Sequence, residues 1–240
     1  WTGVTAVLAL VAGAVAFVVL YQTTDVPDPN ADFQTQTSFV YYRNGETELG
    51  EFATQNRVSI DLEQMPADLK DAVIAAENRT FWTDQGIDPR GIVRAAFSNA
   101  RGNSTQGAST ITQQYVKILY LTQERTLSRK AKEALLSLKI QRQQSKEEIL
   151  EGYLNTIYFG RGAYGVEAAA QAYFATPAAE LTLRQSAFLA SVLNNPGSYD
   201  PEGGDRAALK ERYEYTLSGM AEMGTASEAE VERASRALPR

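Results

Sequence analysis

Two residue types that carry much of metal and acid–base chemistry are missing from this chain: its 240 residues include no cysteine and no histidine. The lack of cysteine excludes a disulfide framework, a thiolate metal site and a cysteine nucleophile. The lack of histidine excludes a Ser-His-Asp triad, a histidine zinc site and an imidazole base. Acid–base chemistry near neutral pH must therefore come from Asp, Glu, Lys or Tyr side chains whose pKa values are shifted by their surroundings.

An overall excess of basic residues is also missing. The formal charge is −6 and the isoelectric point is near 4.9. Because a duplex-binding protein needs a basic contact face, nucleic acid is excluded as a general partner. Hydrophobic residues make up 44% of the chain, which is enough for one well-cored domain or a domain with a small additional lobe.

Charge is missing from residues 1–21. About 20 apolar residues suffice for a helix to cross a bilayer core of roughly 30 Å. Trp1 and Tyr21 bracket the run, as interfacial aromatic residues often do. A buried core helix is rarely apolar on all sides over this length. A cleaved signal peptide would have a shorter apolar run and a small-residue cleavage site. We therefore expect residues 1–21 to form one transmembrane helix.

The rest of the chain divides into three predicted parts. Residues 22–60 read as a juxtamembrane linker with a short β hairpin, whose strands are expected at 38–42 and 57–60 around a turn at Asn44-Gly45. Residues 61–201 form the predicted catalytic domain, with helical periodicity from Pro66 onward. Residues 202–240 are expected to form C-terminal helices that act as a connector.

Apolar spacing and capping signals predict where the helices lie. Capping boxes at Ser145 with Glu148 and at Thr182 with Gln185 each mark a helix start, and Pro196 marks the end of the second of these helices. Further helices are expected at Leu69–Ala76, Ile92–Ala100, Leu127–Gln143 and within 205–237, with a polar loop at Gly102–Gly107. For Leu127–Gln143 the spacing predicts an inward face of Ala131, Ala134, Leu135 and Leu138.

Glu77 is the first candidate for chemistry. It lies one turn beyond Val73 at the edge of an apolar stripe, and Phe81 and Trp82 follow it. Partial loss of hydration raises the pKa of a carboxyl group and makes it a better base or acid near neutral pH. The alternative is a helix-end carboxylate that pairs with Arg79 or is solvated.

The second candidate segment is Gly107–Gln114, which is rich in small and hydroxyl-bearing side chains and ends in two glutamines. Such side chains can place hydroxyl and amide groups against a sugar or a phosphate. The alternative is a polar loop that enters a helix, with Ser109 or Thr110 as the cap.

The third candidate segment is basic. Between Lys117 and Arg142, seven basic residues stand against two acidic ones, a local charge of +5 within a chain of −6. The basic residues are Lys117, Arg125, Arg129, Lys130, Lys132, Lys139 and Arg142. Pairing of Glu133 with Arg129 and Lys130 along one helix face would explain part of this run. The apolar residues 118–121 beside Lys117 instead favour an anionic lipid headgroup at a membrane surface.

The segment Gly160–Gly165 fits the pattern G-x-G-x-x-G. A dinucleotide site would need a preceding strand of a βαβ unit, whereas a predicted helix precedes this segment. We therefore do not assign it to nucleotide binding.

In their order along the chain, these segments resemble glycosyltransferase family 51. That family comprises the N-terminal domains of class A penicillin-binding proteins and the monofunctional peptidoglycan transglycosylases. The resemblance runs from about Pro66 to Pro201. The matching segments are Glu77–Phe81 (family pattern E-D-x-x-F), Gly107–Gln114 (G-A-S-T-I-T-Q-Q), Arg129–Glu133 (R-K-x-K-E), Ile149–Asn155 (I-L-E-x-Y-L-N), Tyr158–Gly160 and Tyr164–Ala169. Two positions depart from the family pattern: Asn78 stands where the family usually has Asp, and Asp84 where it often has His.

The resemblance implies a mainly α, lysozyme-like helical domain with a smaller membrane-proximal lobe, placed around Ile92–Arg125, after one transmembrane helix. It implies a single-pass protein of the bacterial cytoplasmic membrane with its catalytic domain on the extracytoplasmic face. The implied partners are lipid II, the growing lipid-linked glycan and the membrane, together with a C-terminal transpeptidase domain and cell-wall synthesis proteins. The sequence itself contains no S-x-x-K, S-x-N and K-T-G set.

The implied reaction is polymerisation of lipid II with inversion at the sugar and release of undecaprenyl pyrophosphate. Glu77 would be the general base. Glu133, the second essential carboxylate of the family, would orient basic groups or hold a metal ion or a water. The expected substrate-binding residues are Ser109, Gln113, Gln114, Lys117, Arg125, Arg129, Lys130, Lys132 and Tyr158. A divalent cation, Mg²⁺, is the expected cofactor.

Two other functions are compatible with a helical domain of this kind. One is a lysozyme-like hydrolase, which would need an acid to protonate a sugar oxygen and would not need the basic cluster. The other is a membrane-tethered scaffold that binds cell-wall lipid without turnover.

Overall fold

The computed structural model describes residues 58–91, 109–120 and 126–239, with the side chain of Leu127 left aside. It also describes the backbone of 38–41 and 48–52, and short N-terminal stretches at 4–5, 8, 11, 15, 19–24 and 26. This part of the chain is mainly helical, as predicted. The helices are α3 (Ala67–Glu77), α5 (Ile111–Tyr120), α6 (Leu127–Gln143), α7 (Lys146–Thr156), α8 (Val166–Phe174), α9 (Leu183–Val192), α10 (Arg206–Glu222) and α11 (Glu228–Ser235), with 3₁₀ turns at Leu62–Gln64 and Ala178–Glu180. The strands are β1 (Ser38–Tyr41), β2 (Glu48–Phe52), β3 (Tyr158–Gly160) and β4 (Ala163–Tyr164).

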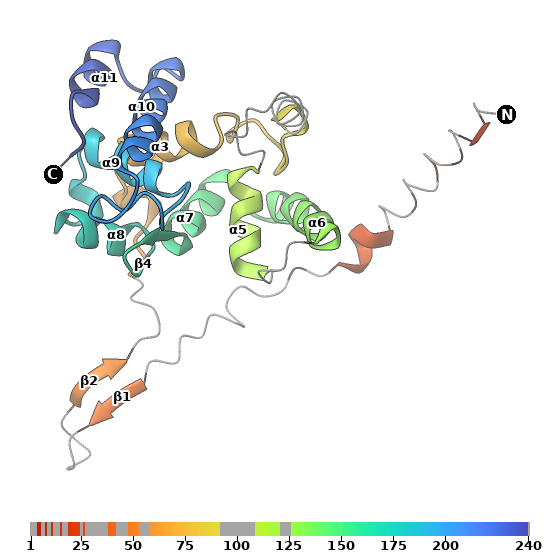
Figure 1. The fold of residues 1–240 in the computed structure, drawn as a ribbon. Coiled ribbons are helices and arrows are strands. Elements are labelled where there is room, and N and C mark those ends of the chain that lie inside the picture. The colour runs from red at the N-terminus through yellow and green to blue at the C-terminus, as the bar shows by residue number, and fades with distance from the viewer. Residues whose placement is uncertain are drawn as a thin grey trace.

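The helices form two groups (Figure 1), and α8 links them because it contacts both α7 and α9. In the first group, α3 packs against α9 and α10, and α11 packs against α10. In the second group, α5 packs against both α6 and α7. Leu69, Ala72, Val73 and Ala76, the apolar stripe read from the sequence, are all buried in α3. Burial of that stripe brings the C-terminal end of α3, and therefore Glu77, to the line where the two groups meet.

Local signals predicted the helix ends well. The Ser145–Glu148 and Thr182–Gln185 capping boxes are both formed, at the starts of α7 and α9. Each box satisfies two backbone N–H groups that the first turn leaves without an intrahelical partner. The predicted bounds Leu127–Gln143 for α6 are confirmed, and residues 205–237 contain α10 and α11.

The predicted inward face of α6 is partly wrong. Leu135 is buried, but Ala131 is exposed, and the deeply buried positions include Glu133 and Ile140 instead. A charged residue is ordinarily placed on the outer face of a helix, because burying an unpaired charge is costly. Here Glu133 has two cationic partners, described below, and these allow the face that carries it to turn inward.

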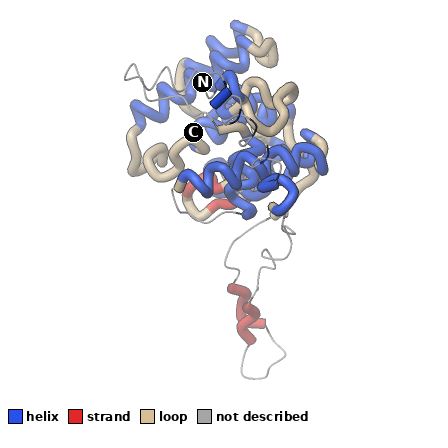
Figure 2. Tube along the Cα trace, turned by 90° about the vertical axis from the view of Figure 1, so that its right-hand side faces the viewer, coloured by secondary structure: helices blue, strands red, loops and turns tan. Residues whose placement is uncertain are grey.

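The predicted hairpin is present, but its second strand lies elsewhere. β1 pairs antiparallel with β2, with Ser38 opposite Phe52, and the pair lies apart from the helices in Figure 2. The assignment of residues 57–60 to the second strand is wrong for Val58–Ile60, which are not in a strand. The Asn155 side chain bonds both backbone groups of Ile60, at 3.1 Å to its N–H and 2.9 Å to its carbonyl oxygen. Those backbone groups are therefore bound to α7 rather than to a strand.

The segment Gly160–Gly165 contains the turn and the second strand of the tight β3–β4 hairpin, which was not predicted. Gly160, Arg161 and Gly162 all have positive φ values, which the turn requires. α7 precedes the hairpin and α8 follows it, so the glycines serve a turn rather than a phosphate-binding loop.

Several expectations lie outside the described residues: most of residues 1–21, the helix expected at Ile92–Ala100, the loop at Gly102–Gly107, and most of the lobe expected around Ile92–Arg125. Within the described residues, none of the helices combines the length and the apolar character that crossing a membrane requires.

Candidate functional site

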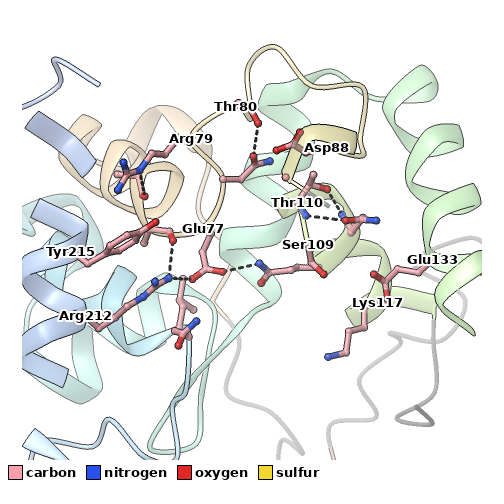
Figure 3. Close-up of a pocket in the computed structure, with 18 of the residues that line it drawn as sticks. Glu77, Arg79, Thr80, Asp88, Ser109, Thr110, Lys117, Glu133, Arg212 and Tyr215 are labelled. Atoms are coloured by element: carbon pink, nitrogen blue, oxygen red, sulfur yellow. Dashed lines mark hydrogen bonds and ion pairs between the residues drawn. The ribbon is translucent and has the colours of Figure 1, made fainter. Parts of the chain in front are cut away.

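A cavity of about 530 Å³ opens where α3, α5, α6 and α10 come together (Figure 3). Its lining is mostly polar and includes Glu77, Asn78, Arg79, Thr80, Asp88, Ser109, Thr110, Gln113, Gln114, Lys117, Arg129, Lys130, Glu133, Asn194, Arg212 and Tyr215. In Figure 3, Glu77 lies between two groups of side chains, with Arg212 and Tyr215 on one side and Lys117 and Glu133 on the other.

Glu77 is the last residue of α3, and its side chain is only 9% exposed. Arg212 Nη2 donates to Oε1 at 2.9 Å, and Gln114 Nε2 donates to Oε2 at 2.8 Å. Both donors bind the ionised carboxylate, which is the form that a base needs. Because each carboxylate oxygen has two lone pairs, Glu77 keeps capacity to accept a proton from a hydroxyl in the cavity.

Arg212 was missed by the sequence analysis. The same Nη2 atom also donates to the carbonyl oxygen of Ala76 at 2.7 Å, so one guanidinium binds both the backbone and the side chain at the end of α3. Arg212 and Arg79 both lie over the Tyr215 ring, at 4.8 and 4.9 Å from its centroid. The available signal was weak: an arginine one turn beyond buried Leu209 in α10.

Gln114 is oriented by a buried tyrosine. Tyr153 OH donates to Gln114 Oε1 at 2.9 Å, so the amide NH₂ of Gln114 faces Glu77. Burial raises the pKa of Tyr153 well above its usual value of 10.0. Tyr153 therefore remains a protonated donor at neutral pH, and the Gln114 amide is held in one orientation.

The start of α5 explains a further part of the Gly107–Gln114 segment. Thr110 N donates to Gln113 Oε1 at 3.0 Å, and Gln113 N donates to Thr110 Oγ1 at 3.1 Å. This is a reciprocal capping arrangement, so the alternative that Thr110 caps a helix is confirmed. Gln113 lines the cavity, but its amide oxygen is already used within the helix cap.

The opposite wall of the cavity is basic. Glu133 is 2% exposed; Arg129 Nη1 donates to its Oε2 at 2.8 Å, and Lys130 Nζ donates to its Oε1. Lys130 Nζ also donates to Ser109 Oγ at 3.0 Å. Lys117 reaches the same wall from α5, is exposed, and has no ion pair among the residues that the structure describes. Glu133 thus holds two cations at the cavity while Lys117 stays available to an anion.

The structure brings most of the predicted site residues together, but not all of them. Eight line the cavity: Glu77, Ser109, Gln113, Gln114, Lys117, Arg129, Lys130 and Glu133. Lys132 is exposed on α6 away from the cavity. Tyr158 is 38% exposed on β3, where its ring lies 4.7 Å from that of Tyr164. Arg125 lies outside the described residues.

The protein groups of this cavity do not by themselves fit a divalent cation. No three acidic side chains within the described ranges are grouped so that they could hold a metal ion. Both carboxylate oxygens of Glu133 are bound by cations, and those of Glu77 by Arg212 and Gln114. Neither carboxylate therefore offers uncompensated charge to a metal.

Comparisons with known proteins agree on one family. Residues 45–221 match the family model described as Transglycosylase. The chain is 43% identical over 233 residues to penicillin-binding protein 1A of Aquifex aeolicus, covering 95% of this chain and 32% of that protein. It is 42% identical over 219 residues to penicillin-binding protein 1A of Rickettsia bellii, covering 88% of this chain and 27% of that protein. The chain thus spans about three tenths of the length of the curated relatives it matches.

A solved structure of penicillin-binding protein 1A from Haemophilus influenzae is also similar, with 24% identity and a TM-score of 0.47 over 85% of this chain and 21% of that chain. A likeness of this size adds nothing to the argument from the sequence matches.

Proposed function

From the premise that the chain belongs to the transglycosylase family, we propose that it is a peptidoglycan glycosyltransferase that polymerises lipid II into glycan strands. One observation carries the proposal: a buried carboxylate, Glu77, lies in a cavity whose opposite wall is basic. Transfer from a lipid diphosphate needs these two features, a base for the attacking hydroxyl and positive charge for the leaving group.

Glu77 acts as the general base. It takes the proton from the 4-hydroxyl of lipid II while that oxygen attacks the anomeric carbon of the growing lipid-linked glycan. The bond from that carbon to the diphosphate oxygen breaks, and undecaprenyl pyrophosphate leaves with the bonding electrons. Attack on the face opposite the leaving group inverts the linkage from α to β.

The basic wall stabilises the departing diphosphate. A diphosphate leaves as an anion, so it needs nearby positive charge rather than a proton. Lys117, Arg129 and Lys130 line the cavity in a position to supply it, and Arg125 is proposed to join them. Glu133 orients two of these cations through its ion pairs. Ser109, Gln113 and Gln114 are proposed to bind the substrate, while binding roles for Lys132 and Tyr158 stay predictions.

A divalent cation, Mg²⁺, remains part of the proposal as a neutralising partner of the diphosphate. Its ligands would be supplied mainly by the substrate, because the Glu77 and Glu133 carboxylates already have donors or cationic partners. The chain's own contribution is the fixed set of ammonium and guanidinium groups.

The wider setting follows from the resemblance and is likewise proposed. The helical domain would be lysozyme-like, with its smaller lobe at the membrane. Residues 1–21 would anchor it as a single-pass protein of the bacterial cytoplasmic membrane, with the cavity on the extracytoplasmic face. A C-terminal transpeptidase domain and cell-wall synthesis proteins would be its partners.

Purified lipid II tests the proposal directly. The full chain, in detergent or in vesicles, is incubated with labelled lipid II, and the products are separated by gel electrophoresis. We expect a ladder of glycan polymers that disappears on muramidase treatment. A lysozyme-like hydrolase would instead release fragments from preformed glycan, and a binding scaffold would leave lipid II unchanged. Either result contradicts the proposal.

A further inference from the structure

A buried ion pair is hydrogen-bonded to Asn78 in the cavity lining and takes no direct part in the reaction described above. Lys146 Nζ and Asp84 Oδ1 are 2.7 Å apart, and their side chains are 12% and 4% exposed. The Lys146 ammonium also lies 4.5 Å from the centroid of the Phe81 ring. Burial lowers the pKa of Lys146, and the hydrogen bond to Asp84 works against that shift. Such a pair is costly to bury and is weak evidence for stability alone.

The position of Lys146 in its helix also argues against a role in stability alone. It is the first residue of α7, where the helix dipole favours negative charge over positive charge. The helix start is already capped by Ser145 and Glu148, so Lys146 is not needed there. A residue that goes against a local preference in this way often serves a site elsewhere.

From this ion pair, one route of hydrogen bonds leads to the backbone beside Glu77. Asn78, the C-cap of α3, donates from Nδ2 to Asp84 Oδ2 at 2.7 Å. Thr80 Oγ1 donates to Asn78 Oδ1 at 3.0 Å, so both ends of the amide are bound. Asn78 and Asp84 are the two positions that depart from the family pattern. They are partners in one hydrogen bond, with the amide at position 78 and the carboxylate at position 84.

A second route leads to the Glu77 carboxylate through α5. Gly86 N donates to Asp84 Oδ1 at 2.9 Å, and the carbonyl oxygen of Gly86 accepts from Thr110 Oγ1 at 2.7 Å. Thr110 caps α5, whose next turn carries Gln114, the donor to Glu77 Oε2. α7 contributes to this route at two residues: Lys146 pairs with Asp84, and Tyr153 donates to Gln114. The ion pair and Tyr153 therefore bind α3 and α5 to the same helix.

We propose that Asp84 and Lys146 are positioning residues for Glu77, acting through Asn78 on one side and through Gly86 and α5 on the other. This inference rests on the proposed function, since these hydrogen bonds would hold the Glu77 carboxylate in line with the acceptor hydroxyl. A purely structural role would lower stability but leave the turnover of the folded protein unchanged. A positioning role lowers kcat in protein that is fully folded, with little effect on the apparent KM for lipid II.

The first test compares D84N, K146M and the double variant in the full chain with labelled lipid II. Circular dichroism fixes a temperature at which every variant is folded. We expect each single change to lower kcat at least about tenfold, with KM within about twofold, because small misplacements of a reacting group are costly. The double variant should be no slower than the slower single variant, since the pair acts as a unit. The matched control is K210M, which removes an exposed lysine whose partner on α10 is Glu214.

A second test exchanges the amide and the carboxylate and guards against simple loss of fold. N78D alone places two carboxylates within hydrogen-bond distance and should be the slowest folded variant. N78D/D84N restores one donor and one acceptor and should regain at least about fivefold in kcat. Wild-type kcat in folded D84N and K146M, or no gain on exchange, overturns the positioning role while leaving the proposed function intact. A wild-type chain that makes no polymer overturns the proposed function, and the positioning role falls with it.

Discussion

The Glu77 carboxylate is held at both oxygens by side chains from other helices. Arg212 comes from α10 and Gln114 from α5, and each is bound in turn by a further partner. A buried carboxylate without such donors would be strongly disfavoured in its ionised form. The arrangement therefore satisfies both oxygens of a base that is shielded from bulk water.

Arg212 offers a test of this environment. R212M leaves the Glu77 charge without its cation, and loss of one partner of a buried pair is expected to lower the free energy of unfolding by about 3 kcal/mol. It should also lower kcat by roughly 10- to 100-fold, because the base loses its fixed position. R212K keeps the charge but not the planar guanidinium. Its free energy of unfolding and its kcat should therefore lie between those of the wild type and those of R212M.

The measurements for Arg212 are urea denaturation and lipid II turnover. R206M, a change at an exposed arginine at the start of the same helix, is the matched control. Wild-type kcat in R212M would show that the ion pair has no part in catalysis.

Lys117 and Arg125 test the placement of the leaving group. We expect K117A and R125A to reduce use of the lipid-linked donor more than affinity for the acceptor, because the diphosphate leaves only from the donor. The comparison is made by varying a short glycan donor and lipid II separately, with K210A as the control for loss of an exposed charge. Equal effects on both substrates would show that the diphosphate lies elsewhere.

Among individual residues, local sequence singled out Glu77 and the basic segment, because each has an unusual composition, whereas Glu133 became a candidate only through the family resemblance; Glu77, Glu133 and part of the basic segment line the cavity. Local sequence could not identify Arg212, which is 135 residues from Glu77 along the chain. The two glutamines differ in role: Gln113 is used in a helix cap with Thr110, three residues away, whereas Gln114 binds Glu77. The cap could have been read from residue spacing, but the bonds of Gln114 and Arg212 to Glu77 depend on contacts between helices, which residue spacing does not encode.

Among the elements, helix ends were predictable and helix faces less so. A capping box is formed by residues three apart, so its signal is complete in the sequence. The inward face of α6 depends on whether Glu133 finds cations, and the second strand of the hairpin depends on whether residues 57–60 find another partner. Asn155 is that partner for Ile60, and it lies 95 residues away.

Gly86, which follows α3, occupies a position where only glycine fits. Gly86 has a φ of +88°, and a Cβ there would lie 2.6 Å from the carbonyl oxygen of Ser137 in α6. G86A should therefore lower the free energy of unfolding by about 2 to 4 kcal/mol, from backbone strain together with the clash. Gly197 is the matched control, since a Cβ there would meet nothing within 4 Å. Urea denaturation gives both values, and equal midpoints would contradict the role assigned to Gly86.

Across the whole molecule, the cavity exists only when both helix groups are assembled. α10 begins beyond residue 201, the predicted end of the catalytic domain, yet it packs against α3 and supplies Arg212. The domain boundary stays a prediction, but residues on both sides of it line the same cavity.

Burial of tyrosines in this assembly predicts how stability changes at high pH. Burial raises the pKa of Tyr115, Tyr153, Tyr173 and Tyr213 above 10.0, and that of Tyr173 to about 12. Between pH 10 and about 12 the unfolded chain releases protons that the folded chain keeps, so the free energy of unfolding should fall as pH rises. Lys146 has the opposite effect on the free energy of unfolding. Its pKa is lowered in the folded chain, so the unfolded chain keeps that proton up to about pH 10.5 while the folded chain has already lost it. Because four tyrosines act in one direction and one lysine in the other, the free energy of unfolding should decrease overall as pH rises.

Urea denaturation at a series of alkaline pH values measures this loss, and absorbance at 295 nm follows tyrosine ionisation. The buried tyrosines should ionise only as the protein unfolds. Ionisation of all 12 tyrosines together near pH 10 in folded protein would contradict the prediction.

The most direct test of the whole account is the rate of lipid II polymerisation by E77Q, measured beside lipid II binding by the same protein. Glutamine keeps the shape of the side chain but cannot take the acceptor's proton, so polymer formation should fall by about a thousandfold or more. Lipid II binding should remain within about twofold of wild type, and E214Q, a change at a partly exposed glutamate of α10, should retain full activity. Polymerisation by E77Q at close to the wild-type rate would contradict the assignment of Glu77 as the base.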